Sequence, residues 1–448
     1  MDGSYDFIVI GSGQGGVPFA RAAAEAGKRT ALIERAAIGG TCINYGCTPT
    51  KTLVHIAKVA QTVRRAGEYG VLSGPPTMDM PKARELKRQI VADFSNGSRE
   101  QLEKTENLDL IFGHATFTGP KRMRVGERTI EGGAVVIDTG ARPFIPDIEG
   151  LASARYLDNR TIMELDHVPP SLIVLGGGYI GLEFGQMFAR FGSRVTIVEQ
   201  GSRFLPREDA DVADEILEFL RTEGVDVRLG DPVKRVRRSG GVEAELASGM
   251  FVKGDEILVA TGRRPNTDDL GVEAAGIALD GRGFIPVDSR LKTSAEGVYA
   301  IGDVNGGPAF THISYDDFRI LKTNLLDDGD RTTEGRLVPY TMFTDPELGR
   351  IGLSEDEAKR KGIDYRLCKL PMDYVARALE MNETRGFVKA LVSKETDLIL
   401  GAAALGIWGG EIMSMIEIAM MGGLTAKDLA NATFAHPNLS ELLNNLFG

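Results

Sequence analysis

The chain has 448 residues, a net charge of −11 and 42% hydrophobic residues. This length predicts two to four domains with substantial hydrophobic cores. The negative charge argues against a nucleic-acid-binding surface and against electrostatic attraction to anionic membranes. No apolar stretch approaches the length of a membrane span, and the N-terminal residues lack the pattern of a signal peptide. We therefore expect a cytoplasmic protein with neither a nucleic acid nor a membrane as partner.

The chain begins with the pattern of a dinucleotide-binding unit. An apolar strand at residues 5–10 leads into a glycine-rich segment at 11–16, an alanine-rich helix pattern to residue 26, and a second strand at 29–33 that ends at Glu34. The glycines let the backbone approach a pyrophosphate at the helix N-terminus, and the acidic residue binds ribose hydroxyls. Glycines alone are weak evidence, but this complete order predicts a bound dinucleotide.

Two cysteines, Cys42 and Cys47, follow this unit, and a helical pattern at residues 52–65 comes directly after them. The free N–H groups and positive dipole end of a helix stabilise a thiolate, which makes one cysteine reactive near neutral pH. Two thiols this close in sequence can also form and reopen a disulfide in two-electron steps. We interpret them as a redox pair rather than a structural disulfide or two buried free thiols. The third cysteine, Cys368, is expected to be a buried small apolar residue.

The same nucleotide-binding pattern recurs at residues 171–199. The first glycine and the closing acid are 23 positions apart in both copies, from Gly11 to Glu34 and from Gly176 to Glu199. Each copy later ends in a similar Thr-Gly-X-Arg-Pro turn, and the first copy is the longer because it carries the two cysteines. We infer one ancestral module that occurs twice, with one dinucleotide bound by each copy.

Beyond the second copy, a predicted strand runs into Gly302 and Asp303, whose carboxylate can accept a hydrogen bond from a ribityl hydroxyl of a flavin. After a repeated nucleotide-binding unit, flavin contact is a better interpretation than a simple turn. The polar segment at 326–336 predicts a domain boundary or an exposed loop. Strand patterns (386–392) and helical patterns (410–421) mix in the remaining residues, without a third glycine fingerprint.

Together these features resemble the flavin-dependent pyridine nucleotide–disulfide oxidoreductases, which include glutathione reductase, dihydrolipoyl dehydrogenase and mercuric reductase. The resemblance covers essentially the whole chain, and the cysteine motif Cys-Ile-Asn-Tyr-Gly-Cys-Thr-Pro-Thr-Lys is highly specific. This motif and the segments at 204–209 and 313–319 are most similar to the bacterial reactive-chlorine-resistance flavoproteins. The implied fold is α/β, with two Rossmann-like, three-layer dinucleotide-binding domains and an α+β C-terminal dimerisation domain.

The resemblance implies FAD on the first repeat and NAD(P)H on the second. We expect the FAD-binding domain at residues 1–150 and again at 271–335, the NAD(P)H-binding domain at 151–270 and the dimerisation domain at 336–448. Glu199 predicts a preference for NADH, because a carboxylate at this strand end binds the ribose 2′-OH and repels a 2′-phosphate.

The family's catalytic residues correspond to positions of this chain. Cys42 would meet the substrate, and Cys47 would lie against the flavin and form a charge-transfer complex. Lys51 and Glu183 would be the buried ion pair beside the flavin N5. Tyr179 would cover the flavin until the nicotinamide displaces it.

His436 and Glu441 correspond to the acid–base pair that the partner subunit supplies, which implies a homodimer with active sites shared across the interface. Such a histidine can protonate a leaving thiolate and can also serve as the base that regenerates the Cys42 thiolate. His55 and His312 stay open between a role at the active site and a surface or structural one.

The residues expected to bind the two cofactors lie in the glycine turns and at strand ends. For FAD they are Gly11, Gly13, Gly16, Glu34, Gly40, Thr41, Lys51, Thr139, Gly140, Gly302 and Asp303. For NAD(P)H they are Gly176, Gly178, Tyr179, Gly181, Glu199 and Gly262. No metal-ligand set is expected.

The leading hypothesis is a reductase that passes electrons from NAD(P)H through FAD and the Cys42–Cys47 disulfide to a small oxidised acceptor. Hypothiocyanous acid, a low-molecular-weight disulfide and a metal ion such as copper(II) are the candidates, and the sequence leaves the choice among them open. The alternative is a dihydrolipoyl dehydrogenase that acts on lipoyl groups. A third class, a non-catalytic flavin-binding redox sensor, fits poorly with the retention of the whole catalytic set.

Overall fold

The computed structural model describes residues 3–448. Residues 1 and 2, where the first expected domain begins, lie outside the described part. A seven-stranded sheet combines six strands from residues 3–137 with one strand from residues 298–300. Its strands in spatial order are β3 (Leu108–Phe112), β2 (Thr30–Glu34), β1 (Gly3–Ile10), β6 (Arg128–Ile137), β5 (Arg122–Val125) and β4 (Ala115–Gly119), with β16 (Val298–Ala300) also paired to β6.

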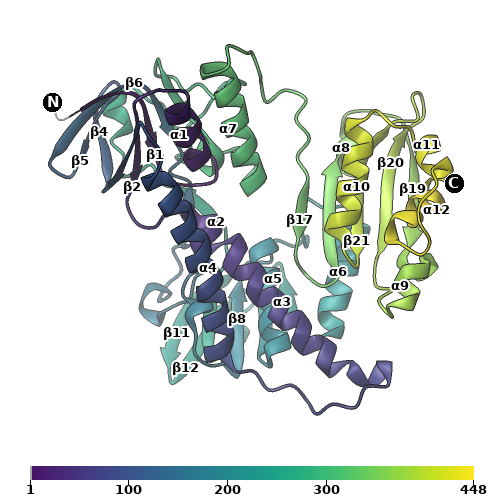
Figure 1. Ribbon diagram of the computed structural model, residues 1–448. Helices are drawn as coiled ribbons and strands as arrows, with labels where there is room; N and C mark the ends of the chain where they lie inside the picture. The colour runs from purple at the N-terminus through teal and green to yellow at the C-terminus, as the bar shows by residue number, and fades with distance from the viewer. Residues whose placement is uncertain (1–2) are drawn as a thin grey trace.

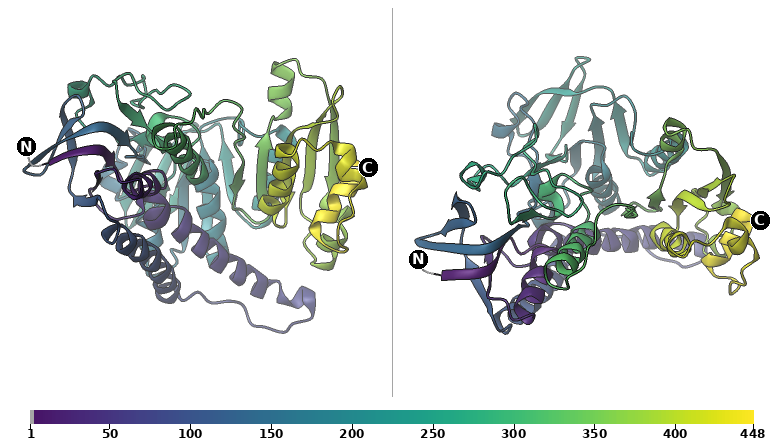
Figure 2. Two further views of the ribbon diagram at one scale, coloured as in Figure 1. Left: turned by 45° about the horizontal axis from the view of Figure 1, so that its top comes forward. Right: turned by 90° about the horizontal axis from the view of Figure 1, so that it is seen from above.

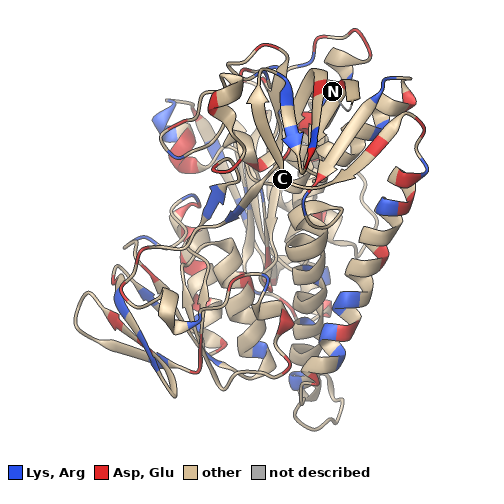
Figure 3. Ribbon diagram, turned by 90° about the vertical axis from the view of Figure 1, so that its left-hand side faces the viewer, with Lys and Arg blue, Asp and Glu red and all other residues tan. Residues whose placement is uncertain are grey.

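The inner strands of this sheet, β1, β2, β3, β6 and β16, pair in parallel, whereas β4, β5 and β6 form an antiparallel meander. Because β16 follows the second repeat, the chain returns to its first sheet after leaving it (Figure 1). The helices associated with this part are α1 (Gly16–Glu25), α2 (Gly40–Tyr45), α3 (Cys47–Arg64), α4 (Met80–Glu103) and α7 (Thr311–Leu325). Figure 3 shows acidic and basic residues interspersed on the face that carries α4.

The second repeat forms its own parallel sheet, with the strand, glycine turn, helix and strand in the predicted order. Its strands and helices are β10 (Asp226–Leu229), β9 (Arg194–Glu199), β8 (Ser171–Leu175), β14 (Glu256–Val259), α5 (Tyr179–Phe191) and α6 (Ala210–Thr222). An antiparallel sheet lies beside it and comprises β11 (Val233–Ser239), β12 (Gly241–Leu246) and β13 (Phe251–Gly254).

The closing turns of the two repeats pair with each other. Strand β7 (Ala141–Pro143) and strand β15 (Arg263–Pro265) form a two-stranded antiparallel ribbon, in which Arg142 lies opposite Arg264. The similar Thr-Gly-X-Arg-Pro segments therefore mark the point at which the two modules meet.

The last quarter of the chain forms a separate lobe at the opposite end of the molecule from β1 (Figures 1 and 2). All neighbouring strands of its five-stranded sheet are antiparallel. The elements are β17 (Tyr340–Met342), β18 (Glu347–Gly352), β21 (Ile399–Gly406), β20 (Phe387–Ser393), β19 (Tyr365–Pro371), α8 (Glu355–Arg360), α9 (Ala376–Glu380), α10 (Gly409–Met421), α11 (Ala426–Asn431) and α12 (Leu442–Phe447). Cys368 is buried in this lobe among apolar side chains, as predicted.

The helix after the cysteines begins earlier than the predicted residue 52, because Cys47 is itself the first residue of α3. Its first turn, Cys-Thr-Pro-Thr, has no apolar periodicity, which hid the start of the helix. Pro49 is tolerated there because the amides of a first helical turn have no partner within the helix. Within residues 3–448, no helix is long and apolar enough to cross a membrane.

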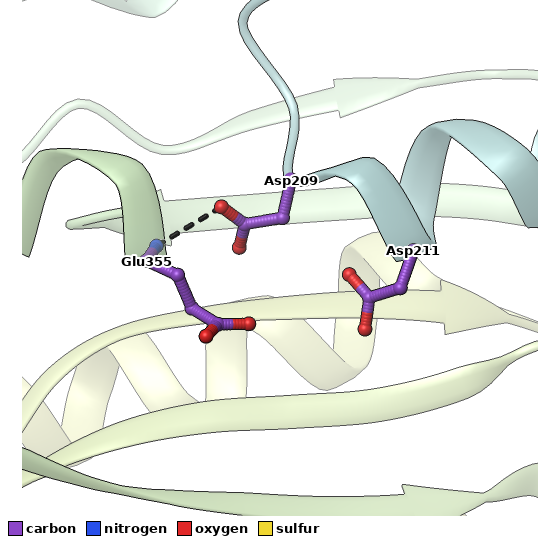
Figure 4. A group of neighbouring side chains, drawn as sticks. All are labelled: Asp209, Asp211 and Glu355. Atoms are coloured by element: carbon purple, nitrogen blue, oxygen red, sulfur yellow. Dashed lines mark hydrogen bonds between the residues drawn. The ribbon is translucent and has the colours of Figure 1, made fainter. Parts of the chain in front are cut away.

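A buried lysine joins the second repeat to the C-terminal lobe. The Asp209, Asp211 and Glu355 carboxylates converge at the N-terminal ends of α6 and α8 (Figure 4), a grouping that by itself could hold a cation. The Lys389 ammonium occupies this position, with Nζ at 3.0, 2.8 and 2.7 Å from oxygens of the three carboxylates. Burial raises the pKa of Asp211, but hydrogen bonds from Lys369 and Lys389 outweigh it and lower that pKa overall.

We expect Lys389→Met to lower the free energy of unfolding by about 3–5 kcal/mol at neutral pH, because it leaves buried carboxylates without a cation. The exposed Lys369, which is 2.6 Å from the other oxygen of Asp211, is the matched control, and Lys369→Met should cost only about 0–1 kcal/mol. Chemical denaturation measures both effects.

The difference in free energy of unfolding between Lys389→Met and the unaltered protein should become smaller as the pH falls. A lowered carboxylate pKa stabilises the folded state above the pKa of the unfolded chain, and this contribution is lost on acidification. Equal costs for the two lysine variants would contradict the role of Lys389.

Candidate active site

One cavity of about 3060 Å³ lies between the two nucleotide-binding modules and the C-terminal lobe. It is well above the roughly 300–1,000 Å³ of a typical ligand pocket, so it has room for two dinucleotides. Most of the residues singled out from the sequence line it: Gly11, Gly13, Glu34, Gly40, Thr41, Cys42, Cys47, Lys51, Thr139, Gly140, Gly176, Gly178, Tyr179, Glu183, Glu199, Gly262 and Asp303.

The third glycine of each fingerprint has a packing role instead. A Cβ atom on Gly16 would lie 2.2 Å from the carbonyl oxygen of Gly11, and one on Gly181 would lie 2.1 Å from that of Gly176. Each glycine therefore allows its helix to start directly against the preceding turn. Gly302 also lies outside the cavity wall, where a Cβ atom would meet Ser314 Oγ at 2.8 Å.

The first module has the features required to hold FAD. Gly11 has a φ of +104°, and a Cβ atom there would lie 2.2 Å from the carbonyl oxygen of Asp138, so only glycine fits this turn. A Cβ atom on Gly40 would lie 3.0 Å from Gly13 Cα, so a side chain at residue 40 would crowd the glycine turn. The buried Thr139 hydroxyl has no hydrogen-bond partner in the protein. An open glycine cradle with an unpaired polar atom at its edge fits a polar ligand such as FAD.

The two acidic strand ends are held in the same way. Glu34 accepts a hydrogen bond from the Ser12 amide at 3.0 Å, and Glu199 accepts one from the Gly177 amide at 2.7 Å. The second oxygen of each carboxylate accepts from the amide two residues further along the chain, at 2.7 Å in both cases. Both carboxylates are thus fixed at the mouth of a glycine turn.

Cys42 lies on α2, and Cys47 begins α3; both are free thiols in the cavity wall. A hydrogen bond from Cys42 is the largest cause that lowers the pKa of Cys47, to about 6, against the opposing effect of burial. The same interaction raises the pKa of Cys42, and burial raises it further. Cys47 is therefore the more acidic thiol of the pair.

The Lys51–Glu183 ion pair lies beside the cysteines and joins three parts of the chain. Lys51 Nζ on α3 is 2.7 Å from Glu183 Oε2 on α5, and the Glu183 side chain is 5% exposed. The other oxygen of Glu183 accepts a hydrogen bond from the Phe343 amide at 2.9 Å. Lys51 Nζ also lies 4.8 Å from the centroid of the Phe343 ring.

Tyr179 takes part in a network that the sequence analysis missed. Its hydroxyl donates to Glu208 Oε1, and the Tyr340 hydroxyl donates to the same oxygen at 2.8 Å. The two rings stack with centroids 5.6 Å apart, and Arg350 Nε lies 3.5 Å from the other oxygen of the buried Glu208. Burial raises the pKa of Tyr179, with the Glu208 charge adding to this effect, so its hydroxyl stays protonated as a donor. The similarity of segment 204–209 to one subgroup of the family was the only sequence signal for Glu208.

Asp303 lines the cavity, but one of its oxygens is already paired. Arg263 of the second closing turn places Nη1 at 2.5 Å from Asp303 Oδ2. His312 also lines the cavity; its ring stacks on Phe310, and its Nε2 lies 2.6 Å from the carbonyl oxygen of Pro339. Burial lowers the pKa of His312, which favours a neutral ring.

Two further histidines considered from the sequence, His55 and His436, do not line the cavity. His55 is exposed on α3 and does not line the cavity. His436 Nδ1 lies 2.9 Å from Glu441 Oε2, and the His436 side chain is 70% exposed on the C-terminal lobe. Glu441 ends a short 3₁₀ turn and immediately precedes α12. Within one chain, therefore, the structure does not bring His436 to the cysteines.

The family described as pyridine nucleotide-disulphide oxidoreductase matches residues 5–317, and its dimerisation domain matches residues 338–447. The chain is 40% identical to the probable pyridine nucleotide-disulfide oxidoreductase RclA of Escherichia coli (strain K12), over 99% of this chain and 98% of that protein. It is 35% identical to dihydrolipoyl dehydrogenase of Thermus scotoductus, over 98% of this chain and 95% of that protein.

Among solved structures, the HOCl-induced flavoprotein disulfide reductase RclA from Escherichia coli matches with a TM-score of 0.92 at 40% identity, over 99% of both chains. A Cu(II) complex of that protein matches with the same values. These matches confirm the predicted fold class.

Proposed function

Because the chain belongs to the pyridine nucleotide–disulphide oxidoreductase family, we propose that it passes electrons from NAD(P)H through FAD and the Cys42–Cys47 pair to a small oxidised acceptor. Membership makes it an oxidoreductase and a flavoprotein that uses a pyridine nucleotide. The observation that carries the proposal is an acidic thiol, Cys47, next to Cys42 in a cavity shared with both glycine fingerprints.

The two modules divide the cofactors between them. Residues 1–150 and 271–335 hold FAD, residues 151–270 hold NAD(P)H, and residues 336–448 form the dimer interface. When bound, FAD supplies two-electron redox chemistry between the pyridine nucleotide and the disulfide. The cradle of Gly11, Gly13 and Gly40 and the turn at Thr139–Gly140 would hold its polar groups, and Tyr179 would cover the flavin until the nicotinamide displaces it.

The chain's own groups manage charge and protons during disulfide reduction. When two electrons and one proton enter, the Cys42–Cys47 bond breaks, Cys47 stays a thiolate and Cys42 becomes the thiol. The Lys51 ammonium, held by Glu183, lowers the pKa of Cys47 by its positive charge. The partner's His436, oriented by the partner's Glu441, takes the proton from Cys42, and the Cys42 thiolate attacks the sulfur of a disulfide or sulfenyl acceptor. The bond within the acceptor breaks, and its leaving group receives the proton from the partner's His436. The Cys47 thiolate then attacks Cys42, which re-forms the Cys42–Cys47 disulfide and releases the rest of the reduced acceptor.

The acceptor is a small molecule that contacts Cys42 directly. The third cysteine of the chain, Cys368, is buried in the C-terminal lobe, so it is not placed to relay electrons to a distant site. Hypothiocyanous acid is the first candidate on family resemblance, and a low-molecular-weight disulfide is the second. Copper(II) is the third, because the similar E. coli protein forms a Cu(II) complex.

An NADH-oxidation assay with hypothiocyanous acid, glutathione disulfide, copper(II) and mercury(II) tests the proposal. We expect turnover with a small oxidant that is lost in Cys42→Ser, while the bound FAD of that variant is still reduced by NADH. Retained turnover in Cys42→Ser would contradict the role of the cysteine pair. Faster reaction with dihydrolipoamide in the reverse direction would favour the dihydrolipoyl dehydrogenase alternative, which the Thermus relative supports.

We expect NADH to be preferred over NADPH because the Glu199 carboxylate lies at the mouth of the second glycine turn. Repulsion of a 2′-phosphate corresponds to roughly 1–3 kcal/mol, or about 5–150-fold in kcat/KM. Glu199→Gln keeps a hydrogen-bond acceptor for the Gly177 amide but removes the negative charge. This variant should lower the ratio of kcat/KM with NADH to kcat/KM with NADPH. A higher kcat/KM with NADPH in the unaltered enzyme would disprove the preference.

Sharing of the active site between subunits predicts complementation. His436→Ala should spare reduction of FAD by NADH and slow acceptor turnover by about 10²–10⁴-fold, the usual contribution of a positioned acid–base group. Mixing Cys42→Ser with His436→Ala subunits should restore activity, because one site of each heterodimer has both unaltered groups. If mass spectrometry demonstrates subunit exchange and the mixture stays inactive, the model of an active site shared between subunits is wrong.

A further inference from the structure

The hydroxyl group of Thr311 contacts the acidic thiol, although the sequence pointed to no role for this residue. Its Oγ1 lies 3.2 Å from Cys47 Sγ, although the two residues are 264 positions apart. Thr311 is the first residue of α7, and Cys47 is the first residue of α3. Two helix N-termini, each with a partial positive charge, therefore meet at one sulfur atom.

The position of Thr311 is constrained by the residues on both sides of it. The rings of Phe310 and His312 stack on each other with centroids 5.4 Å apart. The Phe310 ring also stacks on Tyr340 at 5.3 Å, and His312 contacts the carbonyl oxygen of Pro339. Pro339 and Tyr340, at the start of β17, thus anchor the N-terminus of α7, which holds the Thr311 hydroxyl in place at the cysteine.

The chemistry of the pair determines the direction of this hydrogen bond. A thiolate has no proton, so towards the Cys47 thiolate the Thr311 hydroxyl must be the donor. A hydrogen bond to an ionised acceptor is roughly twice as strong as one between neutral groups. The contact therefore stabilises the thiolate of Cys47 more than its thiol.

We propose that Thr311 is a positioning residue that stabilises the Cys47 thiolate after the disulfide opens, so that the charge remains on Cys47 and the proton on Cys42. This inference rests on the proposed function of the pair. Three other groups act on the same sulfur: Cys42 donates to it, Lys51 attracts the negative charge, and Glu183 repels it.

The inference is tested by the pH dependence of Cys47 alkylation in the reduced holoenzyme, with the modified peptide identified by mass spectrometry. The alkylation midpoint of the unaltered enzyme is expected near 6, the lowered pKa of Cys47. Thr311→Val removes the hydroxyl at nearly constant shape and should raise the midpoint by about one unit. Thr311→Ser retains a donor and should titrate like the unaltered enzyme.

Thr50→Val is the matched control. Thr50 also lies on α3, but its hydroxyl contacts Met163 Sδ rather than a cysteine, so this variant should leave the Cys47 midpoint unchanged. An unshifted midpoint in Thr311→Val, or equal shifts in Thr311→Val and Thr311→Ser, would overturn the inference while leaving the proposed function intact. An ordinary thiol midpoint near 8.5 in the unaltered enzyme would instead overturn the proposed role of Cys47.

Discussion

The ion pair between Lys51 and Glu183 is the contact on which the arrangement of the active site depends. Lys51 comes from the cysteine-bearing helix of the first module, and Glu183 comes from the helix that follows the second glycine turn. The Phe343 amide of the C-terminal lobe completes the junction from the third side. A buried carboxylate is costly unless it is paired and hydrogen-bonded, so each of the three parts must be in place for this junction to form.

Other buried charges repeat this principle along the boundary between the second module and the C-terminal lobe. Glu208 accepts from a tyrosine on each side of the boundary, and Arg190 of α5 lies 2.6 Å from Asp345 of the lobe. Lys389 lies among carboxylates of α6 and α8. Breaking one such pair leaves an uncompensated charge, so these contacts favour one relative placement of the domains. A cavity shared by three domains needs such a placement.

The internal repeat extends to individual hydrogen bonds. Glu34 and Glu199 accept from equivalent amides, and Gly16 and Gly181 exclude a side chain for the same steric reason. The modules differ where their chemistry differs. Only the first contains the cysteine pair, whereas Tyr179 follows the glycine turn of the second, so each module contributes different groups to one cavity.

The sequence alone determined the two nucleotide-binding modules, their order and the placement of Cys42 and Cys47 at the start of a helix, because glycine turns, strand patterns and helix starts are local backbone constraints. It misplaced the start of α3, since Thr-Pro-Thr has no helical periodicity. Only the tertiary structure placed Glu208 at Tyr179 and Thr311 at Cys47, since these partners are 29 and 264 positions apart and no local pattern links them. The tertiary structure also showed that His436 lies away from the cysteines of its own chain, because contacts between distant elements follow from packing rather than from sequence spacing.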